Sequence, residues 1–282
     1  MDTRFLNLKF ESSNKILNIE KNGDYKLIKV EGIESSDYEI NIEQYTQYDG
    51  GYTKKKRVLP RDISIIVDYI DINNASVERQ KLIRFFNPKQ QGILTVNYGG
   101  IEKYILYDVE SFKDLRENLY EPLTFKVDLV CSDPYFKDYS VGEQISTWIG
   151  GLKFKFKLPF KFKQKGESKK NIINDGDVET FIEVFFKGPA VNPCVQNNST
   201  GDFIKVNRGL TSDDTLYIST EFGHRKVEIV RNGVKENAFH YIDPKSTFFQ
   251  LQTGDNMIEY TTENDLDPQS VEVRYRNRYL GV

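Results

Sequence analysis

Few residues in this chain could carry out catalysis. It has two histidines, His224 and His240, and two cysteines, Cys131 and Cys194. Acyl transfer of the Ser-His type would have to use one of these histidines, and a three-histidine metal site is excluded. The cysteines are far apart in the sequence, so neither a disulfide framework nor a thiolate zinc site is predicted. We expect reduced, buried thiols unless the fold brings the two together.

The usual catalytic motifs are also missing. The sequence has no Gly-x-Ser-x-Gly elbow, no phosphate-binding loop, no His-Glu-x-x-His and no Cys-x-x-Cys. Acidic residues are numerous, but a glycosidase needs two carboxyl groups held about 5–10 Å apart, and the sequence nominates no such pair. Residues 174–177 and 213–214 resemble fragments of calcium loops without the full ligand spacing. We therefore predict no catalytic, cofactor-binding or metal-binding residues, and a protein that is not an enzyme.

Length and composition indicate a folded protein rich in strands. The 282 residues suggest about two domains. Hydrophobic residues make up 38% and charged residues 29%, and Phe (19) and Tyr (17) are abundant, which favours strands. The net charge of -3 gives no general attraction to nucleic acid or anionic membranes. No apolar run approaches the roughly 20 residues that span a bilayer, and the N-terminus lacks the pattern of a secretion signal.

Alternating apolar and polar residues predict several strands in the first half, each with one face in the core. One helix is expected between them, because Asn73 and Asn74 supply start signals and Asn87-Pro88 ends the helical region. The apolar residues that define these elements are Leu6, Leu8 and Phe10; Ile63, Ile65, Val67 and Tyr69; Leu82, Ile83 and Phe86 of the helix; Leu94, Val96 and Tyr98; and Leu123, Phe125, Val127 and Leu129.

Residues 49–58 interrupt this pattern with turn glycines followed by a cationic run, DGGYTKKKRV. The segment predicts an extended loop or a long hairpin. Two interpretations remain open, a solvated surface loop and a protruding arm that reaches a neighbouring subunit.

A domain boundary is predicted near 131–136, where the last strong strand of the first half ends at Asp133-Pro134. The expected domains are therefore 1–138 and 139–282. The second half contains many short strands, and Asn232-Gly233 is a strong hairpin signal because both turn residues need positive φ. Short strands at roughly 8–12-residue spacing predict a β-sandwich.

Lysine and phenylalanine alternate over residues 153–163. The pattern could serve a polyanion, a single nucleic-acid strand or a membrane surface. We favour an edge strand whose lysines prevent pairing with other chains.

An ordered set of short motifs resembles the phage distal tail protein (Dit) family, a siphophage tail component. No single motif is specific, but their order extends over almost the whole chain. The motifs are Asp49-Gly50-Gly51-Tyr52 with Arg57, Pro60-Arg61 and Ile63; Arg79-Gln80-Lys81-Leu82 with 85–89; 127–136; 174–180; 188–193; 246–256; and Tyr279-Leu280-Gly281-Val282.

This resemblance implies a mainly β protein of two β-sandwich domains. The first would carry one α-helix and a protruding hairpin, and the second would be galectin-like or carbohydrate-module-like. Six copies would form a ring that links the tail tube protein to the tail-tip hub or tail-associated lysin and to receptor-binding components. The protein would assemble in the host cytoplasm and reside at the virion tail tip, with DNA passing through the ring without sequence-specific contacts. The expected oligomer-interface residues are Asp49, Gly50, Gly51, Tyr52, Lys54, Arg57 and Arg61.

Two other functions compete with this interpretation. A carbohydrate-binding module that recognises host cell-wall polysaccharide should present exposed aromatic residues on a platform or groove. A hydrolase would need a cleft with paired carboxylates or one of the two histidines. The family members that carry a long inserted module differ from this chain, which has none.

Overall fold

The protein is described by a computed structural model over residues 6–116, 118, 121–138, 141–147, 168–263 and 268–282, with the backbone alone for 141–147. Contacts divide the chain into two units. Unit 1 is Met1–Tyr139 with Tyr279–Val282, and unit 2 is Ser140–Arg278. Unit 2 is thus inserted into unit 1. The sequence-based division placed everything after residue 138 in the second domain, whereas the contacts return residues 279–282 to the first.

Unit 1 is built on a path of strands in the order β2-β1-β7-β8-β9-β6-β3. The long strand β8 (Ile101–Asp114) pairs with β7 through its first half and with β9 through its second half. It therefore belongs to both layers of the sandwich. The other strands of unit 1 are β1 (Leu6–Ser12), β2 (Lys15–Ile19), β3 (Tyr25–Glu31), β4 (Tyr38–Gln44), β5 (Gly51–Val58), β6 (Arg61–Tyr69), β7 (Gly92–Tyr98), β9 (Leu123–Cys131), β10 (Phe136–Lys137) and β22 (Arg278–Tyr279), whose first residue ends unit 2.

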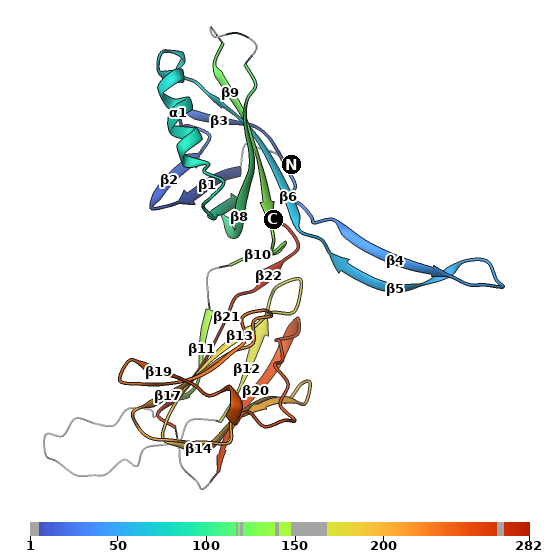
Figure 1. Cartoon of the computed structure of the whole chain (residues 1–282), viewed down its shortest axis with the longest axis vertical. Helices are drawn as coiled ribbons and strands as arrows, with labels where there is room; N and C mark the ends of the chain where they lie inside the picture. Colours follow the sequence, from blue (N-terminus) through green and yellow to red (C-terminus); the bar gives the residue numbers. More distant parts are fainter. Residues whose placement is uncertain (1–5, 117, 119–120, 139–140, 148–167, 264–267) are drawn as a thin grey trace, which may run out of the picture. The chain divides into compact units, whose positions relative to one another are not determined.

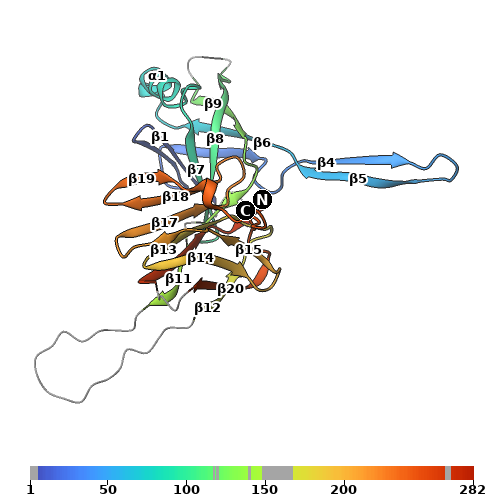
Figure 2. The same cartoon turned by 60° about the horizontal axis from the view of Figure 1, so that its bottom comes forward.

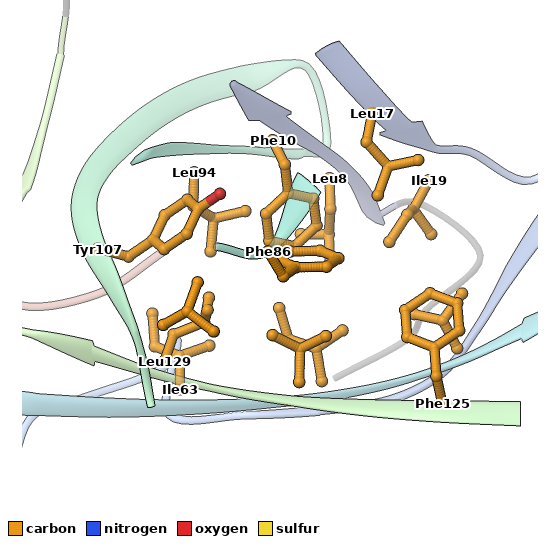
Figure 3. Packing of buried hydrophobic residues seen from close by; sticks show 14 of the residues in the cluster. Leu8, Phe10, Leu17, Ile19, Ile63, Phe86, Leu94, Tyr107, Phe125 and Leu129 are labelled. Atoms are coloured by element: carbon orange, nitrogen blue, oxygen red, sulfur yellow. The ribbon is translucent and has the colours of Figure 1, made fainter. Parts of the chain in front are cut away.

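The core of unit 1 lies between these layers, where apolar side chains from both meet (Figure 3). The Phe10 ring packs edge-on against Phe86 and Tyr107, with centroid distances of 5.4 and 5.8 Å. Every second residue of β1, β6 and β9 is buried. The alternation read from the sequence is confirmed, because a pleated strand turns successive side chains to opposite faces.

The helix α1 (Ala75–Phe85) follows a short 3-10 turn, η2 (Ile72–Asn74), which Asp71 caps by accepting from the Asn73 amide. Leu82 and Phe86 are buried as predicted. The prediction for Ile83 was wrong, because its side chain is 44% exposed and Phe85 is buried instead. Residues three and four apart share a helix face, so 82, 85 and 86 face the core and 83 is turned away.

Unit 2 consists of two packed sheets, as predicted for the second half (Figure 2). One has the order β11-β21-β13-β17-β18-β19, and the other has β12-β20-β14-β15 with β16 beside β14. Phe186 of the first sheet meets Tyr260 of the second edge-on at 5.8 Å. The strands are β11 (Val141–Thr147), β12 (Lys169–Asn174), β13 (Ile182–Lys187), β14 (Ala190–Asn197), β15 (Asp202–Lys205), β16 (Gly209–Leu210), β17 (Asp214–Ser219), β18 (Lys226–Arg231), β19 (Val234–Asn237), β20 (Gly254–Glu263) and β21 (Ser270–Tyr275), with a 3-10 turn η3 (Phe239–Tyr241).

The hairpin predicted at Asn232-Gly233 joins β18 to β19, and the two residues have φ values of 49° and 80°. The alternating Lys-Phe segment, residues 153–163, lies outside the described residues. Within the described part of the chain, no helix is both long and apolar enough to cross a membrane.

Gly92, the first residue of β7, leaves room for the buried Tyr107 ring, and a Cβ at this position would overlap that ring. We expect Gly92→Ala to destabilise unit 1 by about 1–3 kcal/mol, because overpacking forces core side chains out of their rotamers. Denaturant unfolding of the full chain would measure the loss. Gly209→Ala is the matched control, since its Cβ would meet nothing closer than 4.0 Å; equal stability of the two variants would contradict the prediction.

Candidate functional site

The two histidines do not form a catalytic arrangement with other described residues. His224 lies in the exposed turn after β17, and its amide donates to the Glu221 carbonyl oxygen. His240 lies in η3, with its ring 3.9 Å from that of Tyr241. Among the residues that the structure describes, no three His, Cys, Asp or Glu side chains converge as metal ligands would.

The cysteines lie in different units and are both free, as predicted. Cys131 is buried at the end of β9, and burial raises the pKa of its thiol to about 12. Partial burial also raises the pKa of Cys194, which lies on β14 of the five-stranded sheet and is half-buried rather than buried as predicted. Because the thiolate is the nucleophilic form, neither environment activates a cysteine.

Asp214 is a buried acid that accepts hydrogen bonds from two residues. The Arg231 guanidinium donates to it at 2.6 and 2.9 Å, and the amide and hydroxyl of Thr211 both donate at 2.8 Å. The bonds from Arg231, followed by those from Thr211, hold the pKa of Asp214 well below its usual range although the residue is 1% exposed. The donors are all internal to unit 2, so the lowered pKa has a structural cause. Asp214 and Arg231 together anchor the start of β17 to the end of β18.

Residues 174–177, the other segment that resembled a calcium loop, form a turn in which the Asn174 side chain is hydrogen-bonded to the backbone. Asn174 accepts from the Gly176 amide and donates to the carbonyl oxygens of Val178 and Leu251, at 3.0, 3.0 and 3.2 Å. The segment therefore closes a turn of unit 2 with its own side chain.

A shallow pocket lies on the five-stranded sheet of unit 2. Within it, Glu263 accepts hydrogen bonds from Lys205 at 2.9 Å and from Asn192 at 2.7 Å. The pocket is lined by Asn192, Cys194, Gln196, Phe203, Lys205, Thr261, Thr262 and Glu263. Glu263 is the only carboxylate among these lining residues, so the pocket lacks the pair of carboxyl groups that acid-base hydrolysis needs.

The feature that distinguishes unit 1 is a two-stranded arm, β4 with β5, which leaves the sandwich and projects beyond it (Figure 1). The segment expected to be a loop or long hairpin is a hairpin. At its tip the Tyr45 amide donates to the carbonyl oxygen of Gly50, which has a φ of 91°. At its root the Leu59 amide donates to the Asp37 carbonyl oxygen at 2.9 Å.

The two faces of the arm differ in character. On one face Glu39 pairs with Arg57, and Glu43 binds both Lys54 and Tyr52. The bonds from Lys54 and then Tyr52 lower the pKa of Glu43. These pairs tie the strands together on the polar side.

The opposite face carries Tyr38, Ile40 and Ile42, which alternate with the polar residues along β4. Ile40 and Ile42 are 54% and 60% exposed. Facing them across the arm are Val58, Lys56 and Thr53. Isolated two-stranded hairpins are marginally stable in water, so this apolar face calls for a partner surface.

Six of the seven predicted interface residues lie on this arm: Asp49 and Gly50 at its tip and Gly51, Tyr52, Lys54 and Arg57 on β5. Position 51 requires glycine, because a Cβ there would overlap the Glu43 carbonyl oxygen on the paired strand.

Arg61 is set apart from the other six. It begins β6 with only 1% of its surface exposed, so its side chain lies inside unit 1 rather than on the arm. Its guanidinium donates to the carbonyl oxygens of Gly32 at 2.7 Å, Pro134 at 2.8 Å and Leu280. Burial lowers the pKa of this arginine.

Sequence analysis missed the apolar half of the arm. Tyr38, Ile40 and Ile42 alternate with Glu39, Asn41 and Glu43, which is the same period-two signal that identified the other strands. The signal that would have found them was therefore present in the sequence.

Comparisons with known proteins find one matching family model and several solved structures with a similar fold. Residues 175–279 match the family described as siphovirus-type tail component, C-terminal domain. The Dit protein of phage SPP1, whose structure was described as a paradigm of the hub adsorption apparatus in phages infecting Gram-positive bacteria, has a TM-score of 0.68 at 12% identity, covering 97% of this chain and 99% of its own. A chain of the phage P2 baseplate in its activated, calcium-bound conformation has a TM-score of 0.55 at 12% identity, covering 96% and 98%. No curated protein sequence matches.

These matches confirm the resemblance predicted from the sequence. The family model matches residues 175–279, nearly all of which lie in unit 2, and almost the whole chain shares the fold of the SPP1 protein.

The Asp214 anchor makes a testable contribution to the stability of unit 2. We expect Asp214→Asn to cost about 1.5–3 kcal/mol near pH 7, because it removes charge-assisted hydrogen bonds. Since the folded-state pKa lies below the unfolded value of about 3.9, this contribution is fully present above about pH 5 and is lost as the pH falls through the folded-state pKa. Thermal unfolding at pH 7, 5 and 3 should show the deficit shrinking toward low pH. The exposed neighbour supplies the control, Asp213→Asn, and a deficit that stays constant with pH would contradict the assignment.

Proposed function

We propose that this protein, with its siphovirus-type tail component fold, is a structural distal tail protein of a long-tailed bacteriophage or prophage. Six copies form a ring that links the tail tube to the tail tip and to the host-adsorption components. The role is architectural: the protein holds neighbours in place and catalyses no reaction.

Two findings support the tail-tip assignment. The family match of residues 175–279 is to a tail component, and the solved proteins that share the fold include the SPP1 Dit protein and a chain of a phage baseplate. The likeness to the SPP1 protein extends over both units, so the fold as a whole corresponds.

The observation that carries the proposed assembly is the exposed apolar face of the arm. Tyr38, Ile40 and Ile42 are presented on a sheet of only two strands, β4 and β5. In a ring, each subunit meets the next through two different patches related by a rotation that closes. An arm that leaves its own subunit can supply one of these patches and reach the other on a neighbour.

Apolar burial is the kind of contribution that such a contact requires. Association costs an estimated 4–15 kcal/mol, and each fully buried Ile or similar side chain returns about 1.5–3 kcal/mol. The three apolar side chains of β4 can therefore offset a substantial share of the cost, while the salt-bridged face, being exposed, contributes little.

The ring's other partners follow from its place in the tail. It would contact the tail tube protein on one side and the hub or tail-associated lysin on the other, with receptor-binding components attached. The near-balanced charge of the chain suits a ring that DNA passes through, because a strongly basic wall would retain phosphates by counterion release. The protein would assemble in the host cytoplasm and remain in the virion tail tip.

One observation favours a second role, recognition of a host cell-wall polysaccharide by unit 2. Phe222 is 76% exposed, and the Arg225 guanidinium lies between its ring and that of Phe248, 5.8 and 5.2 Å from the centroids. Phe248 stacks in turn on the half-exposed ring of Phe239 at 5.6 Å. This aromatic row resembles the exposed platform expected of a carbohydrate-binding module.

The ring proposal is tested by placing charge on the apolar face of the arm. We expect Ile40→Lys with Ile42→Lys to abolish ring formation, because the substitutions remove the two apolar side chains and place a second ammonium directly across from Lys56, where its burial has a large desolvation cost. Mass photometry over a concentration series, with negative-stain electron microscopy, would count sixfold particles.

Asn41→Lys is the control: it adds one positive charge, against two in the double variant, to the opposite face of the same strand. It should assemble as the unmodified chain does. Sixfold rings formed by the double variant would remove the apolar face from the mechanism, and an unmodified chain with no sixfold species at any concentration would contradict the hexamer.

The polysaccharide role makes a separate prediction. If it holds, the full chain should bind purified wall polysaccharide saturably in calorimetric titration, and Phe222→Ala with Phe239→Ala should weaken binding by about tenfold or more. Val234→Ala removes another exposed apolar side chain of unit 2 as the control. Absence of saturable binding by the unmodified chain would reject the role.

A further inference from the structure

Arg61 joins three segments of unit 1 that are far apart in the sequence. Gly32 directly follows β3 on the way into the arm, Pro134 lies in the turn between β9 and β10, and Leu280 lies in the C-terminal tail. The carbonyl oxygens of all three accept from the Arg61 guanidinium, which also lies over the Phe136 ring at 4.9 Å. A planar guanidinium with fixed donors can hold several acceptors in one geometry, which a single ammonium cannot.

The C-terminal tail, residues 279–282, packs against the segment that leads into the arm. The Val282 amide donates to the Ile33 carbonyl oxygen at 3.0 Å. Lys103 donates to the Gly281 carbonyl oxygen at 3.0 Å, with its ammonium 3.8 Å from the centre of the Tyr279 ring.

Gly281 makes the fit of the tail specific. A Cβ at this position would overlap the carbonyl oxygen of Glu34. Ile33 beneath the tail is fully buried. The tail is therefore part of the packing that fixes residues 32–34, rather than a loose end.

The same arginine binds residues that lie close in sequence to both points at which the chain passes between the units. The chain leaves unit 1 after residue 139 and returns at residue 279. Pro134 lies shortly before the exit and Leu280 directly after the return, so both connections and the entry to the arm meet at one side chain. The arm closes within two residues of that side chain, at the Leu59 amide bonded to Asp37.

We infer that Arg61 and the C-terminal tail form a latch that fixes the root of the arm. Arg61 acts as a positioning residue, and residues 279–282 are the strap that it fastens across residues 32–34. Through the latch, the direction of the arm depends on the position of residues 279–282, where the chain re-enters unit 1 from unit 2. The inference deepens the proposed function, on which its consequence for assembly rests, but the latch itself is a property of a single chain.

Hydrogen exchange on the full chain, read amide by amide, tests the latch independently of any ring. In a variant lacking residues 280–282, we expect the Leu59 amide at the arm root to exchange at least about tenfold faster. The Tyr45 amide at the arm tip, which bonds to Gly50, should exchange at its original rate. The amides of β6 and β9 should also keep their protection, because their pairing does not involve the tail.

Two substitutions address the same latch from either side. Arg61→Lys keeps the charge but loses the fork of donors, and Gly281→Ala displaces the strap; both should accelerate exchange at Leu59 and Val282. The controls are Arg116→Lys, which alters an arginine bound to Asp114, and Gly209→Ala.

Unchanged exchange at Leu59 in the truncated chain would overturn the inference. Equal acceleration throughout β6 and β9 would overturn it too, since that result describes general destabilisation rather than a latch. In mass photometry, a latch variant should require about tenfold or higher concentration to form the rings of the unmodified chain. If the unmodified chain forms no rings, the proposed function fails while the exchange result still decides the latch.

Discussion

A two-stranded sheet cannot bury its own apolar face, and this constraint governs how the molecule can work. In each sandwich, alternating side chains from two layers fill a shared core, to which Phe10 of β1 and Phe125 of β9 both belong in unit 1. The arm has no second layer, yet β4 repeats the same alternation with Tyr38, Ile40 and Ile42. Its sequence therefore has the pattern of a half-buried strand, and in the proposed ring a neighbouring subunit would supply the missing half of the burial.

The arm can serve such a contact only if its root is fixed. An apolar hairpin that swings freely loses orientational entropy when it docks, and this loss subtracts from the gain of burial. The polar face limits twisting within the arm through the Glu39–Arg57 pair and the contacts of Glu43. Arg61 supplies the corresponding restraint at the root, which explains why a full positive charge is retained inside a sandwich with carbonyl oxygens as its acceptors.

The sequence predicts much of the fold and little of this arrangement, for a physical reason. Burial on one face leaves a period of two in the chain, so strands such as β1, β6 and β9 are visible in the sequence. The same signal was present at 38–43, but only the turn glycines and lysines that follow it were interpreted, as an extended loop or a long hairpin, so the first strand of the arm was missed. Ile83 was misassigned because helix position, rather than residue type, decides which side chains face the core.

The role of Arg61 could not be predicted from its neighbours. The resemblance placed this residue among the expected interface residues, together with Arg57. Its acceptors come from positions 32, 134 and 280, and no local pattern encodes such a meeting of distant carbonyl groups. The resemblance of the motif around Pro60-Arg61 identified an important position, but only the three-dimensional contacts distinguish an exposed contact residue from an internal support.

The insertion of unit 2 into unit 1 gives the C-terminal tail its importance. A domain attached through a single connection can move without disturbing its neighbour, whereas an inserted domain is tied at both ends. Here the returning end continues into residues 279–282, where Gly281 packs against the segment leading to β4. Strain on that returning end would act on the root of the arm. In the proposed ring, residues 279–282 would therefore give a covalent route from unit 2 to the root of the arm that contacts the neighbouring subunit.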